Sequence, residues 1–249
     1  MVTVKSQSEI ELMKKAGAIL RDVLELVSEK AKPGVTTKQL DNIAYDYIVK
    51  QNAVPSFLGY GGFPGSLCLS IDDEVVHGIP SPKRVLEEGM LLKIDGGVGI
   101  GGFHTDAART VAIGRVSNEK AALMRCCKEC FFEGIKALKD GARLGDYGAL
   151  CQKYAETRGY GVVRELVGHG IGETVHEDPS VPNYGVAGRG MRVVTGMTLA
   201  IEPMINLGTR RIMQVEGDDW TILTQDGKPS AHYENTVVIR PDGVEIITL

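Results

Sequence analysis

The sequence predicts an α+β protein in which two pairs of helices cover a curved antiparallel sheet with pseudo-twofold symmetry. Helix-like and strand-like segments follow one another as two helices, strands, two helices and strands. The spacing between Gly34 and Tyr47 in the first half is repeated between Gly141 and Tyr154 in the second half. A repeated order of elements with a repeated spacing indicates two related halves that share one layer of strands.

The two helices of the first half have recognisable ends. Ser6 and Glu9 form a capping-box pattern, followed by apolar residues at helical spacing, and Pro33-Gly34 ends the segment. A second helix is expected after a Thr36-Thr37 cap. In the second half, residues 118–138 are expected to form a helix ended by Gly141, and Asp146 to open the next helix.

Strand-like segments bounded by glycine and proline make up much of the remainder. Leu91–Val98 and Phe103–Ile113 flank Gly99-Ile100-Gly101-Gly102, which predicts a β-hairpin. No linker or charge block divides the chain, so we expect a single domain over residues 1–249. Further strands are expected at 67–71, 198–205, 220–223, 233–239 and 244–248.

Composition excludes several classes of function. The 249 residues are 43% hydrophobic and 24% charged, with a net charge of −4, which gives no basis for binding nucleic acid or anionic lipid. The first seven residues contain no apolar signal core, and no apolar run is long enough to span a bilayer, so we expect a cytoplasmic protein. Of the five cysteines, the Cys127-x-x-Cys130 pair is expected to consist of buried or half-buried helical thiols, because it lies inside a helix-like segment without a second pair or a nearby histidine.

Four single carboxylates stand in apolar, strand-like surroundings: Asp95, Asp106, Glu202 and Glu234. If the hairpin closes around Ile100-Gly101, Asp95 and Asp106 lie directly opposite one another, with Cβ atoms about 5 Å apart. Two carboxylates that close repel one another, and a divalent cation between them removes the repulsion. Two later strands can bring Glu202 and Glu234 to the same place.

One histidine completes this set. His169 lies in the glycine-rich run 168–172, where the small residues let the backbone approach closely. Oxygen ligands with a single imidazole suit Mn²⁺, Fe²⁺, Co²⁺ or Zn²⁺ and differ from a structural thiolate site. There are enough carboxylates for two ions, which in hydrolytic sites lie about 3.5–4 Å apart. The residues therefore predict a metal-dependent hydrolase.

Six short motifs carry these residue types in a fixed order: Ile94-Asp95, Gly102-Phe103-His104-Thr105-Asp106, Gly168-His169-Gly170-Ile171-Gly172, His176-Glu177, Ile201-Glu202-Pro203 and Tyr233-Glu234-Asn235-Thr236. The series resembles that of the methionine aminopeptidases, in particular the bacterial type I enzymes with the pita-bread fold. The resemblance covers the chain essentially from end to end. It implies the pita-bread fold and removal of the initiator methionine from nascent proteins and peptides.

The resemblance also implies a role for each ligand. Asp95 would chelate the first of two divalent ions (Co, Mn, Fe or Zn), and Asp106 and Glu234 would bridge both. His169 and Glu202 would complete the second. A hydroxide bridging the two metals would then attack the first peptide carbonyl.

Further catalytic roles follow by resemblance. His176 would contact the scissile carbonyl and stabilise the oxyanion, and His77 would lie near the scissile amide nitrogen. Glu202 is the candidate proton shuttle to the leaving amine. The implied partners are N-terminal methionyl peptides and nascent chains near the ribosome, without nucleic acid or membrane, and the protein is expected to be a monomer.

The methionine side chain needs an apolar subsite. In two places the sequence departs from many relatives: Phe57 stands where they carry cysteine, and Val175 where phenylalanine is frequent. Of the remaining histidines, His104 is expected to support the site without binding metal, and His232 to be a surface residue. The positions that match the substrate pocket are Phe57, Tyr60, Phe63, Cys68, Val175 and Trp220, with His77 and His176 also touching substrate.

Two other functions remain open from the sequence. One is a proline-directed enzyme of the same fold, such as an Xaa-Pro aminopeptidase, although those carry an additional amino-terminal domain that we do not expect here. The other is a catalytically inactive pita-bread module that binds ribosomes or other proteins. Such modules lose metal ligands, whereas all five candidates are present in this sequence. Turnover of methionyl against Xaa-Pro peptides separates the first alternative, and metal titration separates the second.

Overall fold

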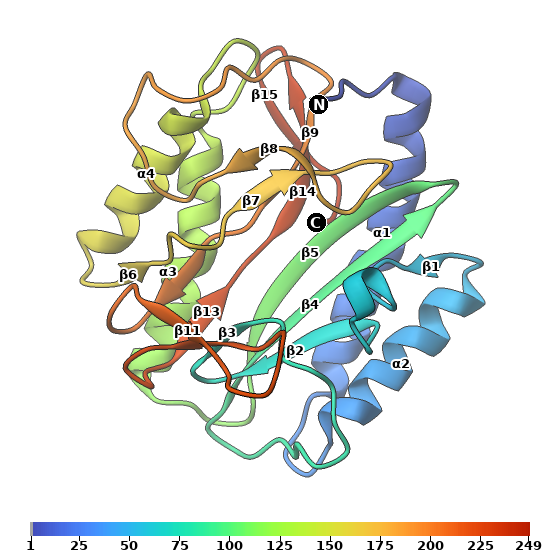
Figure 1. Ribbon diagram of the computed structural model, residues 1–249, viewed down its shortest axis with the longest axis vertical. Coiled ribbons are helices and arrows are strands. Elements are labelled where there is room, and N and C mark those ends of the chain that lie inside the picture. Colours follow the sequence, from blue (N-terminus) through green and yellow to red (C-terminus); the bar gives the residue numbers. More distant parts are fainter. Residues whose placement is uncertain (1) are drawn as a thin grey trace.

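The computed structural model describes residues 2–249, with two pairs of helices on either side of a layer of strands (Figure 1). The blue pair is α1 (Gln7–Lys30) and α2 (Thr37–Lys50), and the green-yellow pair is α3 (Asn118–Ile135) and α4 (Leu144–Glu156). A short 3-10 turn, η1, covers Tyr60–Gly62. Helices flanking antiparallel strands confirm the predicted α+β class.

The helix starts follow the predicted capping chemistry. Ser6 and Glu9 form a reciprocal capping box at α1, and Thr36 does the same with Gln39 at α2. The predicted start of α4 at Asp146 was two residues late, because the Asp146 carboxylate reaches back to cap the N–H of Arg143. The third helix ends at Ile135 rather than 138, and a turn carries the chain on.

Four small antiparallel sheets make up the strand layer. The first consists of β1 (Val54–Pro55), β4 (Leu91–Ile100), β2 (Leu67–Ile71) and β5 (Phe103–Ala112). The second has the order β15 (Gly243–Ile246), β14 (Asn235–Arg240), β9 (Thr198–Ile201), β7 (Gly168–Gly170) and β8 (Glu177–Val181). The other two are β13 (Ser230–His232), β10 (Met204–Asn206), β6 (Gly161–Val162), and β11 (Ile212–Gln214), β12 (Ile222–Thr224), β3 (Glu74–Val76).

The hairpin of β4 and β5 closes one residue later than predicted. Its turn is Gly101-Gly102, both with positive φ, so Asp95 pairs with Ala108 and Gly97 pairs with Asp106. The predicted direct opposition of Asp95 and Asp106 was therefore wrong. Glycine alone adopts two successive positive φ values without strain, which fixes the turn there. The shift moves Asp106 by two residues along β5, which leaves it on the face that Asp95 shares.

Two strands of the second half differ from their predicted bounds. The segment 198–205, predicted as one strand, breaks at Glu202-Pro203 into β9 and β10, and the strand predicted over 233–239 starts only at Asn235, so that Tyr233-Glu234 forms a break between β13 and β14. Strand β9 pairs with β14, whereas β10 pairs with β13, so the two breaks lie side by side. The chain thus changes sheet at both places, and each break carries one of the predicted ligands.

Each helix pair covers its own apolar core. The first core contains Leu20, Leu40, Leu69 and other residues of α1, α2, β2 and β4. The second contains Phe131 and residues of α3, α4, β9, β10 and β14. All five cysteines are buried free thiols, and this confirms the prediction for Cys127 and Cys130. In residues 2–249 no helix is long and apolar enough to cross a membrane.

Candidate metal centre and pocket

The predicted ligands converge between the two halves. Asp95 lies on β4, Asp106 on β5 and His169 on β7, while Glu202 and Glu234 occupy the two strand breaks. His169 Nε2 lies 3.9 Å from Asp106 Oδ2 and 3.7 Å from Glu202 Oε1. Ligand atoms of Asp106, His169 and Glu234 all fall within 4.8 Å of one another. Side chains far apart in the sequence therefore face one small volume.

The carboxylates of this cluster lack the partners that buried acids need. Asp95 Oδ1, Asp106 Oδ1 and Glu234 Oε1 are buried without a hydrogen bond from any described residue. Burial raises the pKa of Asp95 to about 7 and that of Glu202 to about 8. Burial, followed by repulsion from neighbouring acids, also raises the pKa values of Asp106 and Glu234. Unpartnered acidic oxygens that repel one another fit divalent cations, which supply the missing positive charge.

The backbone around His169 explains its glycine neighbours. A Cβ at Gly168 would collide with the carbonyl oxygen of Ala200, and one at Gly170 with that of Asp178. His169 Nδ1 is 2.8 Å from the Gly170 carbonyl oxygen, so Nδ1 carries the proton and Nε2 faces the acids with its lone pair. Burial lowers the pKa of His169 to about 4, which keeps this imidazole neutral.

Two further predicted histidines border the cluster. The His176 ring lies 4.2 Å from the His169 ring, centroid to centroid, and its Nδ1 is 2.9 Å from the Tyr60 hydroxyl. His77 stands with positive φ at the end of β3 and faces the Trp220 ring edge-on. Burial lowers the pKa of His77 to about 4, so both donor and acceptor nitrogens are available there.

The predicted apolar residues form a pocket beside the acids. Phe57, Phe63, Cys68 and Val175 pack together, with Trp220 against them. The rings of Phe63 and Trp220 meet edge to face at 5.1 Å. The cavity has a volume of about 120 Å³ and is lined by these side chains other than Val175, by Tyr60, His77, His169 and His176, and by the four acids. A short apolar side chain next to a reactive centre is the ligand that such a cavity accommodates.

The two remaining histidines, His104 and His232, differ in their position relative to the acid cluster. His104 Nδ1 lies 2.8 Å from the Ser56 hydroxyl, outside the acid cluster. The predicted surface position of His232 was wrong, because its side chain is buried and its Nε2 lies 3.6 Å from Glu202 Oε2. Sequence reasoning missed a usable signal: His232 precedes Glu234 by two residues, and alternate residues of a strand share a face.

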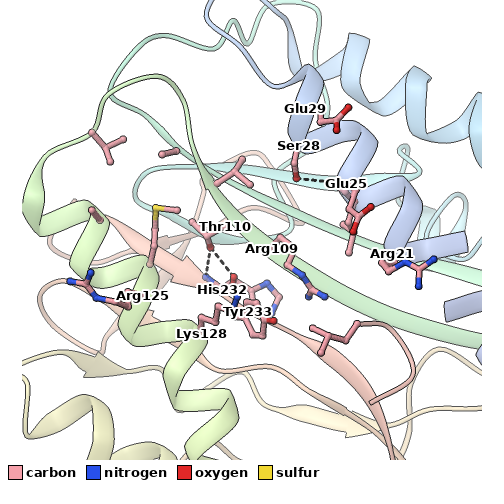
Figure 2. Close-up of a pocket in the computed structure, with 17 residues that line it drawn as sticks. Arg21, Glu25, Ser28, Glu29, Arg109, Thr110, Arg125, Lys128, His232 and Tyr233 are labelled. Carbon is pink, nitrogen blue, oxygen red and sulfur yellow. Dashed lines mark hydrogen bonds between the residues drawn. The ribbon is translucent and has the colours of Figure 1, made fainter. Parts of the chain in front are cut away.

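A second hollow lies between α1 and α3 over β5 and β13 (Figure 2). It measures about 830 Å³, and its lining includes Arg21, Arg109, Arg125, Lys128 and Tyr233. The Arg109 guanidinium stacks 4.7 Å from the centroid of that ring. Although larger, this hollow holds neither of the two metal-compatible groups of side chains in full, so the smaller cavity is the candidate site.

The chain matches known proteins over nearly its whole length. The sequence model of metallopeptidase family M24 matches residues 11–241. A methionine aminopeptidase of Clostridium acetobutylicum is 53% identical over all of this chain and 99% of its own length. Methionine aminopeptidase 1 of Bacillus subtilis is 43% identical over 100% and 99%. The crystal structure of a methionine aminopeptidase from Thermotoga maritima superposes with a TM-score of 0.97 at 40% identity, covering 100% of this chain and 99% of that one.

Proposed function

The chain belongs to the methionine aminopeptidases of metallopeptidase family M24, and from this membership we propose that its metal centre removes the initiator methionine from nascent proteins and peptides. One observation carries the proposal: the ligands meet, with unpartnered oxygens, beside an apolar cavity. The cavity accounts for recognition of the methionine side chain and the ligands account for hydrolysis.

A metallopeptidase of this family uses divalent metal ions. We infer that the site would hold two ions, with Asp95 at one, His169 and Glu202 at the other, and Asp106 and Glu234 available to both. When bound, such ions activate water at neutral pH and polarise a carbonyl group. The mixed oxygen and imidazole donors accept Co²⁺, Mn²⁺, Fe²⁺ or Zn²⁺.

His176 is proposed to stabilise the negative charge that develops on the substrate carbonyl oxygen. Tyr60 can donate its hydroxyl hydrogen to Nδ1 of His176 across 2.9 Å. The other nitrogen, Nε2, then carries the imidazole proton and becomes the donor toward the oxyanion. Tyr60 thus fixes both the orientation and the tautomer of this histidine.

Glu202 and His77 are proposed to handle the proton and the leaving amine. The Glu202 carboxylate lies within the ligand cluster, with Oε1 3.7 Å from His169 Nε2, where it can take a proton from water and pass it on. His77, on the wall of the same cavity, supports the scissile amide nitrogen as it becomes an amine. The leaving amine thereby receives its proton from Glu202.

The apolar residues are proposed to select methionine. Phe57, Phe63, Cys68, Val175 and Trp220 form one packed cluster, so the bound side chain is desolvated on several sides. The larger Phe57 and smaller Val175 reshape this subsite relative to many relatives without removing its apolar character. Discrimination against shorter apolar side chains would then rest on filling the cavity.

The alternatives left open by the sequence are not favoured. Full-length relatives at 40–53% identity carry the name methionine aminopeptidase. An inactive module would have lost ligands, whereas all five lie in one cluster. We further propose that residues 1–249 act as one catalytic domain, because ligands from both halves are needed for a single site. We also propose that the protein acts as a monomer on nascent chains in the cytoplasm, near the ribosome.

The test is turnover by apo-protein reconstituted separately with Co²⁺, Mn²⁺, Fe²⁺ and Zn²⁺. A Met-Ala-type peptide should be cleaved with at least one ion, and a matched Xaa-Pro peptide should not. Asp106→Asn provides the inactive control. Binding of metal without cleavage of any methionyl peptide would overturn the proposal.

A further inference from the structure

We propose that His232 is a sixth protein ligand of this centre, binding through Nε2 the ion that Asp95 and Glu234 hold. The inference rests on the proposed metal centre and adds an imidazole to the five ligands expected from the sequence. Ligand atoms of Asp95, His232 and Glu234 all lie within 4.8 Å of one another, and all three residues are buried. The group shares Glu234 with the one formed by Asp106, His169 and Glu234.

The distances fit shared coordination rather than direct hydrogen bonds. His232 Nε2 lies 3.6 Å from Glu202 Oε2 and 3.7 Å from Glu234 Oε2. Hydrogen bonds between nitrogen and oxygen are shorter, about 2.7–3.2 Å. Two ligands that are each about 2.1 Å from one ion are separated from one another by roughly 3–4 Å. The spacing between His232 and Glu234 is therefore that of two atoms bound to one cation, and Glu202 borders the same group.

Within the described part of the chain, the His232 imidazole has no hydrogen-bond partner. His232 is 1% exposed, and neither Nδ1 nor Nε2 has a hydrogen-bond partner among residues 2–249. A buried polar atom left unpaired costs about 1–3 kcal/mol, so such atoms in proteins are nearly always satisfied. The unpaired oxygens of Asp95 and Glu234 belong to the same group. A cation between them satisfies the Nε2 lone pair and both acids.

The position of the ring is fixed by its backbone. The Thr110 hydroxyl accepts from the N–H of His232 at 2.9 Å and donates to its carbonyl oxygen at 2.7 Å, as Figure 2 shows. His232 also pairs with Met204 in the ladder of β13 and β10. The next residue, Tyr233, directs its ring into the hollow between α1 and α3. Strand alternation therefore aims His232 at the acids.

The two groups are alike in composition. Each contains one aspartate and one histidine, and Glu234 belongs to both. With His232 bound, each of the two ions receives an imidazole nitrogen. Nitrogen donors favour Co²⁺ and Zn²⁺ over Mn²⁺, so His232 also biases the choice of metal at the Asp95 position.

Nitrogen NMR of the zinc-titrated protein, labelled with ¹⁵N in its histidine rings, tests the assignment. Two Nε2 resonances should move to the coordinated region, and His232→Gln should remove one of them. The variant should also bind Zn²⁺ about 10–100-fold more weakly at one site, with a smaller loss for Mn²⁺. His104→Gln is the matched control, and should remove only a resonance that zinc does not move.

The outcomes separate this inference from the proposed function. If only the His169 resonance moves in wild-type protein, His232 is not a ligand, although the metal centre stands. If no resonance moves, the metal centre itself is overturned. The wild-type titration decides between these results even where His232→Gln fails to fold. Unchanged zinc and manganese affinities in a folded His232→Gln variant would likewise exclude ligation.

Discussion

Two buried carboxylate environments in this protein differ in every respect except burial. Asp41, on α2, accepts hydrogen bonds from the backbone N–H groups of Ser66 and Leu67 at 2.7 and 3.1 Å, and from Lys38 Nζ at 2.7 Å. Asp95 and Glu234 are equally buried but keep oxygens without any donor among the described residues. Burial of an acid thus does not identify a functional site, whereas burial without donors does.

The difference reflects what each acid holds. Asp41 ties α2 to the start of β2, so its donors are part of the fold and arrive with it. The acids of the metal centre come from segments that meet only in the folded chain, and the side-chain nitrogen groups of residues 2–249 that lie within 4 Å of them are neutral imidazoles. Their charge is left for an ion from solvent. The first acid serves stability and the others serve binding at the expense of stability.

Exchanging each acid for its amide should give opposite results. Glu234→Gln removes a shared ligand and should lower kcat/KM at least about 10³-fold, equivalent to about 4 kcal/mol. Asp41→Asn should leave kcat/KM close to wild type and lower the free energy of unfolding by about 1.5–3 kcal/mol, because charge-assisted hydrogen bonds are lost. Peptide turnover and urea denaturation of both variants measure the two effects.

The metal-free forms extend the same comparison. Without ions, Glu234→Gln should be more stable than wild-type protein near pH 7.5, because the amide removes the cost of burying an ionisable acid among other acids, which raises the pKa of Glu234 in the folded protein. Asp41→Asn should be destabilised by the same amount with or without metal. A Glu234→Gln protein that is both active and destabilised would reverse the roles assigned to the two acids.

Metal loading should stabilise the protein through the acids of the metal centre and independently of Asp41. An ion present at 100 times its dissociation constant adds about 2.7 kcal/mol to the free energy of unfolding. For a chain of this size, that corresponds to a rise in Tm of about 5–10 °C. Calorimetry with and without chelator should show this rise in wild type and Asp41→Asn, and a reduced rise in Glu234→Gln.

The stability of the metal-free protein should fall as pH rises. Burial raises the pKa of Asp95 to about 7 and that of Glu202 to about 8, whereas acids in an unfolded chain titrate near 4. The folded protein therefore retains protons that the unfolded chain releases between these values. One retained proton costs stability on the order of 2–3 kcal/mol between pH 5 and pH 7, and the loss continues until the folded groups ionise.

Thermal scans across this pH range check the sign. The metal-free Tm should be higher at pH 5 than at pH 7.5, and Glu234→Gln should reduce the difference. Asp41→Asn should keep the wild-type slope. A metal-free protein whose stability rises steadily from pH 5 to pH 7.5 would mean that the acids are ionised and compensated by side chains alone.

The smallest effect is expected from the exposed partner of Asp41. The Lys38 side chain is 40% exposed, so its ion pair with Asp41 is screened by solvent. Lys38→Met should lower the free energy of unfolding by less than about 1 kcal/mol, since the two backbone donors remain. Urea denaturation of the single variants and of the double variant with Asp41→Asn separates the ion pair from the backbone bonds.

The sequence by itself determined the components of this enzyme. Capping residues such as Ser6 and Thr36 specify helix starts through contacts within one turn, which is why they were predictable. The acids in apolar segments likewise indicated a metal site, since buried charge requires compensation, and the glycines around His169 indicated close backbone packing there. Local chemistry of this kind can be read without knowing the fold.

Only the tertiary structure decided how these parts meet. The turn at Gly101-Gly102 sets the register of Asp95 and Asp106, and the change of sheet at Glu202 and Glu234 is a matter of which strands pair. His232 is the clearest case, because its spacing from Glu234 is compatible with a shared face, whereas its burial against the acids depends on other segments of the chain. Its environment comes from β10, Thr110 and distant carboxylates, and contacts between segments that are far apart in the chain exist only once the chain has folded.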